Sequence, residues 1–128
     1  MTESIPMKKN RPPSRKFPGF PEDWNGEYGF TQYPNLLEEF WCDLSGSSQK
    51  VLDFVIRQLR GWSKEEDIIA LSQFKDGIGG RSKNRGTGLS ISQIRRAITE
   101  LEEGGYIEVE RYRNRPSTFR LVIEGTEE

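Results

Sequence analysis

The segment from Leu89 to Ile107, LSISQIRRAITELEEGGYI, constrains the fold of this chain more than any other. Ser90 followed three residues later by Gln93 is a capping-box pattern, in which two side chains satisfy free backbone amides at a helix start. Gly104 and Gly105 follow, and glycine accepts the left-handed backbone that ends many helices. Apolar residues recur between these signals at the spacing of one helical face, namely Ile91, Ile94, Ala97, Ile98 and Leu101. We therefore predict a helix whose apolar stripe packs on a core.

The opposite face of this predicted helix carries hydrogen-bonding side chains and two positive charges. The major groove of B-DNA admits an α-helix, arginine pairs with guanine there, and glutamine pairs with adenine. Because Glu100, Glu102 and Glu103 follow on the later turns, we expect the N-terminal half of the helix to contact DNA. The candidate base-reading residues are Ser92, Gln93, Arg95, Arg96 and Thr99.

Two stretches with alternating apolar residues follow the helix, over 107–112 and 118–123, and predict a β-hairpin. A helix followed by a hairpin suggests a winged helix-turn-helix, which is an α+β and mainly α fold. We expect the hairpin arginines, at or near its tip, to contact DNA phosphates or an adjacent minor groove. The alternative is that they protect an exposed sheet edge by charge. These arginines are Arg111, Arg113, Arg115 and Arg120.

The predicted winged-helix DNA-binding domain covers residues 35–124. Its central helix carries Val51, Leu52, Val55, Ile56 and Leu59 on one face, so we expect it to be the main core helix. The elements predicted before the Leu89–Ile107 segment are a helix over 36–41 capped by Asn35 with Leu37, Phe40 and Trp41 facing inward, a helix over 49–61 capped by Ser45 or Ser47, a strand over 68–71, and a brief helix from Ser72.

The stretch between the last two predicted helices, KDGIGGRSKNRGTG over 75–88, is rich in glycine and holds four Lys or Arg against one Asp. It lacks the order G-x-x-x-x-G-K-[ST], and Ser82 stands where a G-x-G-x-x-G motif needs its last glycine. Nucleotide binding is therefore not expected. The hypothesis is that Arg81, Lys83 and Arg85 contact DNA phosphates, and the alternative is a solvated loop.

Two segments precede the domain. Residues 1–16 hold five Lys or Arg against one Glu and include Pro12-Pro13, so they predict a flexible basic tail. It is either a solvated terminus or an arm that follows a phosphate backbone through Lys8, Lys9, Arg11, Arg15 and Lys16. Residues 17–34 combine six aromatic residues with Gly and Pro, which indicates an irregular strap anchored by the aromatic rings. Residues 125–128 are predicted to be an acidic C-terminal tail.

Composition excludes several classes of site. The chain has no histidine and one cysteine, Cys42, so an internal disulfide and a Cys/His zinc site are impossible. We expect no cofactor and no metal. Glu65, Glu66 and Asp67 are adjacent but lack a histidine or convincing nucleophile, so we do not expect an enzyme.

The chain shows no signal peptide, and no apolar run approaches the roughly 20 residues that a membrane helix needs. We therefore predict a cytoplasmic protein of a bacterial host cell, associated with the nucleoid and not with a membrane. The net charge of −1 conceals strong segregation, because residues 17–48 hold six acids and no base. This acidic, aromatic segment leaves a protein partner open, and a homodimer is also open.

Several stretches resemble the N-terminal domain of phage replication protein O. They are FTQYPN over 30–35, DLSGSSQKVLDFVIRQLRGW, EEDIIALSQF and GTGLSISQIRRAITELEEGGYI, and the resemblance extends roughly over 29–123. It implies a replication initiator that binds repeated origin sites through a winged helix, with Ser92, Gln93, Arg95 and Arg96 on the DNA-reading helix. The basic 75–88 stretch departs from the family. Members use a following region to engage the replicative helicase, and this sequence ends after the hairpin, so we do not expect helicase recruitment.

The leading hypothesis is a double-stranded DNA-binding protein of phage or mobile-element type that binds a replication origin. One alternative is a transcriptional regulator, since one fold serves both purposes. Another is a winged-helix subunit that makes protein contacts within a larger nucleoprotein complex.

Overall fold

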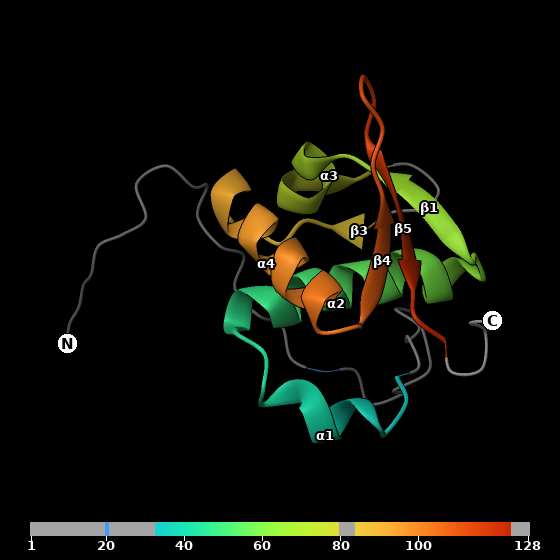
Figure 1. The fold of residues 1–128 in the computed structure, drawn as a ribbon. Helices are drawn as coiled ribbons and strands as arrows, with labels where there is room; N and C mark the ends of the chain where they lie inside the picture. Colours follow the sequence, from blue (N-terminus) through green and yellow to red (C-terminus); the bar gives the residue numbers. More distant parts are fainter. Residues whose placement is uncertain (1–19, 21–32, 80–83, 124–128) are drawn as a thin grey trace. The chain divides into compact units, whose positions relative to one another are not determined.

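The computed structural model describes residues 20, 33–79 and 84–123, in which short strands are interspersed among the helices. All the elements lie within one unit, residues 31–128. This part of the chain has an α+β fold, with four α-helices, a three-stranded antiparallel sheet and a two-stranded one. The elements are α1 (Leu37–Trp41), α2 (Gly46–Leu59), the 3-10 turn η1 (Arg60–Trp62), β1 (Glu66–Ile69), α3 (Leu71–Asp76), β2 (Gly77–Ile78), β3 (Asn84–Arg85), α4 (Ile91–Glu103), β4 (Ile107–Glu110) and β5 (Ser117–Leu121) (Figure 1).

The larger sheet has the order β1-β5-β4, so the last strand of the chain lies in the middle. Its register places Phe119 of β5 between Asp67 of β1 and Val109 of β4. The predicted hairpin is confirmed, with strands shorter than expected, because the first ends at Glu110 and the second runs from Ser117 only to Leu121. The strand predicted over 68–71 begins two residues earlier and ends at Ile69, since Leu71 already starts α3.

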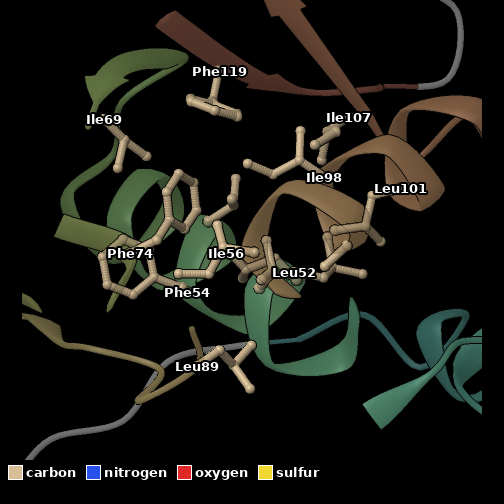
Figure 2. Close-up of a cluster of buried hydrophobic side chains, with 14 of the residues drawn as sticks. Leu52, Phe54, Ile56, Ile69, Phe74, Leu89, Ile98, Leu101, Ile107 and Phe119 are labelled. Atoms are coloured by element: carbon tan, nitrogen blue, oxygen red, sulfur yellow. The ribbon is translucent and has the colours of Figure 1, made fainter. Parts of the chain in front are cut away.

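The core lies between the helices and the inner face of this sheet. Three phenylalanines from α2, α3 and β5 join the layers, with ring centroids 5.0 Å apart from Phe54 to Phe74 and from Phe74 to Phe119. Figure 2 shows these rings among the aliphatic side chains of α2 and α4. The apolar stripe predicted for α4 is confirmed: Ile91 is half-buried, and the buried members are Ile94, Ala97, Ile98 and Leu101.

The capping signals of the two long helices are confirmed. Ser90 Oγ accepts the Gln93 amide at 3.2 Å, and Gln93 Oε1 accepts the Ser90 amide at 2.9 Å. Gly105, with φ of +84°, follows the end of α4. Ser45 Oγ accepts the Ser48 amide at 3.1 Å, so α2 begins at Gly46 rather than at the expected Gln49.

The expectations for the first helix are partly wrong. Asn35 does not cap it with its side chain; its backbone carbonyl accepts the Glu38 amide at 3.0 Å, and Leu36 at the cap position is already helical. Leu37 and Trp41 pack against the core as half-buried side chains. Phe40 is 42% exposed, because a helix of five residues presents only one narrow face inward.

The basic 75–88 stretch contains a small hairpin, β2–β3, which a buried polar network anchors. Asn84 is 4% exposed and donates from Nδ2 to the Phe54 carbonyl at 3.2 Å and to Gln58 Oε1 at 3.3 Å. Gln58 Nε2 and Lys64 Nζ each donate to Asp67 Oδ2 at 2.9 Å. Partial burial raises the pKa of Asp67, but the hydrogen bonds from Gln58, Lys64 and the backbone outweigh it and keep this pKa below its usual range.

The chain returns to the end of α3 before α4 begins. The Thr87 amide donates to the Phe74 carbonyl at 2.8 Å, and the Gly88 amide donates to the Lys75 carbonyl at 3.1 Å. Gly86 sits so close to α3 that a Cβ there would lie 2.2 Å from the Lys75 carbonyl oxygen. Glycine is therefore required at this crossing.

Within the described ranges, no helix combines the length and the apolarity needed to cross a bilayer. The predicted tails, 1–16 and 125–128, and nearly all of the predicted strap, 17–34, lie outside the described residues.

Replacing Asn84 by alanine should lower the free energy of unfolding by about 1–3 kcal/mol, because it removes the donor to the buried Gln58 Oε1 and the side-chain donor to the Phe54 carbonyl. Urea denaturation measures this change. Arg85→Ala, an exposed change one residue along the same strand, is the matched control and should stay within about 0.5 kcal/mol of the parent. Equal losses for both variants would show that the strand as a whole, and not the buried amide, matters.

Candidate nucleic-acid interface

The outer face of α4 is exposed because its other face is buried in the core. Ser92, Arg95, Arg96 and Thr99 are exposed and Gln93 is half-buried. Within the described residues, the Arg95 and Arg96 side chains make no ion pair or hydrogen bond. Two guanidinium groups on adjacent positions are therefore available to an external partner.

The other predicted base-reading side chains are partly engaged. Gln93 Oε1 accepts the Ser90 amide, which leaves mainly its Nε2 to donate to a partner. Thr99 Oγ1 donates to the Arg95 carbonyl at 3.1 Å, and Ser92 Oγ lies 3.4 Å from Ser90 Oγ. Bidentate pairing with adenine uses both the oxygen and the nitrogen of an amide. The capping role of Gln93 therefore competes with that predicted use.

An open groove of about 670 Å³ lies between the outer face of α4 and the start of α2. Glu100 lies in this groove and accepts from Ser45 Oγ at 2.9 Å and from Ser48 Oγ. Hydrogen bonds from Ser48 and Ser45 lower the pKa of this carboxyl. The groove is lined by Ser45, Ser47, Gln93, Arg95, Arg96, Ala97, Thr99, Glu100 and Glu103. Its charges are segregated, with the arginines toward the first turns of α4 and the carboxylates toward its end.

Arg111 joins the β4–β5 hairpin to α4. Its two terminal nitrogens donate to the two carboxylate oxygens of Glu102 at 3.0 and 2.9 Å. The hydrogen bond from Arg111 outweighs partial desolvation and lowers the pKa of Glu102, and the same contact raises the pKa of Arg111. A bidentate pair of this kind fixes orientation as well as distance. Arg111 therefore positions the hairpin on the helix.

Arg120 is not at or near the hairpin tip, contrary to our expectation. It lies in the central strand β5, where the register places it between Glu66 of β1 and Glu108 of β4. Its nitrogens lie 2.7 Å from Glu66, 2.7 Å from Glu110 and 3.9 Å from Glu108. Its position in the sequence suggested the tip, but β5 begins at Ser117, so Arg120 lies within the paired part of the sheet. Arg120 links all three strands.

The hairpin tip carries the remaining two arginines. The Arg115 guanidinium lies 4.0 Å from the centre of the Tyr112 ring, and the Tyr112 hydroxyl lies 3.3 Å from Thr118 Oγ1. Arg113 is exposed and forms no ion pair or hydrogen bond with another described side chain. The tip is therefore the cationic part of the hairpin.

Most of the residues predicted to contact DNA from the loop and the N-terminal arm lie outside the described part of the chain. The loop residues Arg81 and Lys83 lie outside the described residues, as do the arm residues Lys8, Lys9, Arg11, Arg15 and Lys16. Arg85 is exposed on β3. The described ranges contain no group of three or more acidic, cysteine or histidine side chains that could hold a metal ion.

The Glu102–Arg111 pair should contribute about 0.3–1 kcal/mol of coupling to stability at pH 7, because both side chains are partly exposed. Thermal unfolding of Glu102→Gln, Arg111→Gln and the double variant measures this coupling. The carboxylate has a lowered pKa when folded, so the contribution is present above the unfolded-state pKa and is lost as pH falls through the folded pKa. A coupling that persisted when Glu102 is protonated would contradict this assignment.

Comparison with known proteins adds one finding. The sequence profile described as bacteriophage replication protein O matches residues 24–119, from before α1 into β5 and well over half of the 128 residues. No match was found among curated proteins or among solved structures. The matched range includes α2, α4 and β4. The chain belongs to the bacteriophage replication protein O family.

Proposed function

We propose that this protein is a winged-helix module that binds specific double-stranded DNA at a phage replication origin. In this proposal α3 and α4 form the helix-turn-helix, α4 is the recognition helix, and β4–β5 is the wing. The order α2, β1, α3, α4, β4, β5 supports it, because a winged helix has its helices and strands in this sequence. The antiparallel sheet β1-β5-β4 and the packing of α3 on α4 give further support.

The observation that carries the proposal is the outer face of α4, where Arg95 and Arg96 stand exposed with no partner among the described residues. A helix fits the major groove, and an arginine there donates to O6 and N7 of guanine in a bidentate pair. Glu103 is exposed at the last turn and would be repelled by phosphates. The first two turns of α4 therefore enter the groove, and its end stays away from the backbone.

The wing supports this contact in two ways. Arg111 holds it against the end of α4 through Glu102, so the tip has a defined position relative to the recognition helix. Arg113 and Arg115 at the tip then reach the DNA on the flank of the base-read segment. Contacts to phosphate and sugar set register without reading sequence directly, and an arginine at the tip can also enter an adjacent minor groove. Arg111 and Arg120 are structural in this proposal.

The family, described as bacteriophage replication protein O, supports a proposed role at a replication origin in the host cytoplasm. Promoter binding by a transcriptional regulator would use the same surface. A second candidate, contact with a protein partner, is favoured by one observation within the predicted 17–48 segment. Leu36 is 60% exposed and Phe40 is 42% exposed, so this region offers apolar side chains to a partner.

We also propose that the protein acts by binding and not by catalysis. Of the adjacent acids Glu65, Glu66 and Asp67, two have partners within the fold. Glu66 pairs with Arg120, and Asp67 accepts hydrogen bonds from Gln58 and Lys64. With no histidine in the chain, this cluster lacks a general base partner.

Arg96→Ala should weaken binding to a selected duplex by about 1–3 kcal/mol, because it removes a bidentate pair with guanine. Fluorescence anisotropy on a site selected by the parent protein, and on random duplex, gives the two affinities. Arg60→Ala, an exposed arginine beyond the far end of α2, is the matched control and should bind like the parent. An equal loss on selected and random DNA would show that Arg96 contacts only phosphate.

Replacing Arg113 and Arg115 together by alanine should flatten the salt dependence of binding. Each neutralised phosphate contributes about −0.9 to the slope of log affinity against log salt, so the slope should change by roughly 1.8. A salt series by anisotropy on random duplex DNA measures it. Arg120→Ala should leave the slope unchanged while lowering the melting temperature, since its partners are glutamates of the sheet. An unchanged slope in the double variant would remove the wing from the interface.

A further inference from the structure

The charges along the β4–β5 hairpin divide it into an acidic shaft and a basic tip. Glu108 and Glu110 on β4 have side chains 63% and 50% exposed, and with Glu66 they share one guanidinium, that of Arg120. Three carboxylates around one cation leave the outer face of the sheet negative. A hairpin laid sideways along a phosphate backbone would place this face near like charges, which is unfavourable. The negative charge of the shaft therefore favours an approach in which the tip of the hairpin contacts the DNA first.

At the tip, the guanidinium of Arg115 contacts an aromatic ring, and that of Arg113 is exposed. Arg115 is held over Tyr112 at 4.0 Å from the ring centre, within the range of a cation–π contact. Tyr112 is itself tied to β5 through Thr118 at 3.3 Å. Arg113, two residues before Arg115, is exposed and forms no ion pair or hydrogen bond with a described side chain. Figure 1 shows the loop that carries these residues extending beyond the paired strands.

The minor groove is the DNA surface that suits this tip. It is about 6 Å wide in B-DNA, which admits a single extended side chain and not a helix. Where A·T pairs run together, the groove narrows and its negative potential rises, and arginine side chains are drawn into it. Insertion into a narrow groove needs an exposed, unpaired arginine at the end of a narrow element, and the hairpin tip provides one. Contact with a phosphate has no such requirement, because any exposed cation could make it.

We propose that Arg113 reads the minor groove of an A·T-rich segment that flanks the bases contacted by α4, with Arg115 as its positioned neighbour. This inference rests on the proposed DNA-binding function and adds a second determinant of specificity to it. Arg111 contributes by fixing the hairpin to α4, so that the distance between the two DNA contacts is set by the protein.

The test varies only the flanks of a duplex selected by the parent protein from a randomised pool. Three flanks are compared: an A-tract, a G·C sequence, and the same G·C sequence with inosine in place of guanine. Inosine lacks the 2-amino group, so its pair with cytosine presents an A·T-like minor groove and a G·C-like major groove. The proteins are the parent, Arg113→Ala, Arg113→Lys and the control Arg60→Ala, each checked for parental melting temperature.

The parent and the control should bind the A-tract and inosine duplexes about tenfold more tightly than the G·C duplex. Arg113→Ala should bind the three duplexes within about twofold of one another, since the contact that distinguishes their flanks is removed. Arg113→Lys should retain part of the preference, because the charge is kept and the planar group is lost.

Two results would overturn this inference and leave the proposed function standing. One is a flank preference that survives in Arg113→Ala, and the other is an inosine duplex that binds like the G·C duplex. A parent protein that binds its selected duplex but ignores the flanks would do the same. If no selected duplex is bound more tightly than random DNA, the proposed function itself fails, and the inference fails with it.

Discussion

The packing of the apolar face of α4 against α2 and α3 is the interaction on which the rest of this structure depends. Ile94, Ile98 and Leu101 are at most 5% exposed, and complete burial of such a side chain contributes about 1.5–3 kcal/mol. The ion pairs at the surface are each weaker, at about 0.2–1 kcal/mol. Apolar packing therefore decides the rotation of α4 about its axis. That rotation leaves Arg95 and Arg96 exposed.

Surface pairing then separates the charged residues into two kinds. Arg111 and Arg120 are held by glutamates that lie across a helix–hairpin junction and across the sheet. Arg95, Arg96 and Arg113 form no ion pair with an acid among the described residues. The same residue type thus serves as an internal connector in one place and as an exposed cation in another. The proposed interface consists of the second kind.

The β2–β3 hairpin shows how the basic 75–88 stretch is accommodated. Its strand β3 is anchored by Asn84 to α2, and Thr87 and Gly88 satisfy carbonyl groups at the end of α3. The chain therefore leaves α3 and returns beside it, and α3 and α4 pack on one another despite the length of the connection. The buried Asn84 amide and the close approach of Gly86 to α3 therefore hold this connection against α2 and α3.

The sequence by itself was sufficient for the local features of α4 and of the hairpin. The Ser90–Gln93 capping box, the apolar stripe and the glycines at the end depend on neighbours within a few residues, so their pattern predicts the helix directly. The roles of the hairpin arginines were decided by tertiary structure, because Glu102 meets Arg111 across a turn and Glu66 meets Arg120 from a strand 54 residues away. The same holds for Asn84, whose partners lie on α2, 26 and 30 residues earlier. Such groups lie close together only in the folded chain, so no local sequence pattern encodes their pairing.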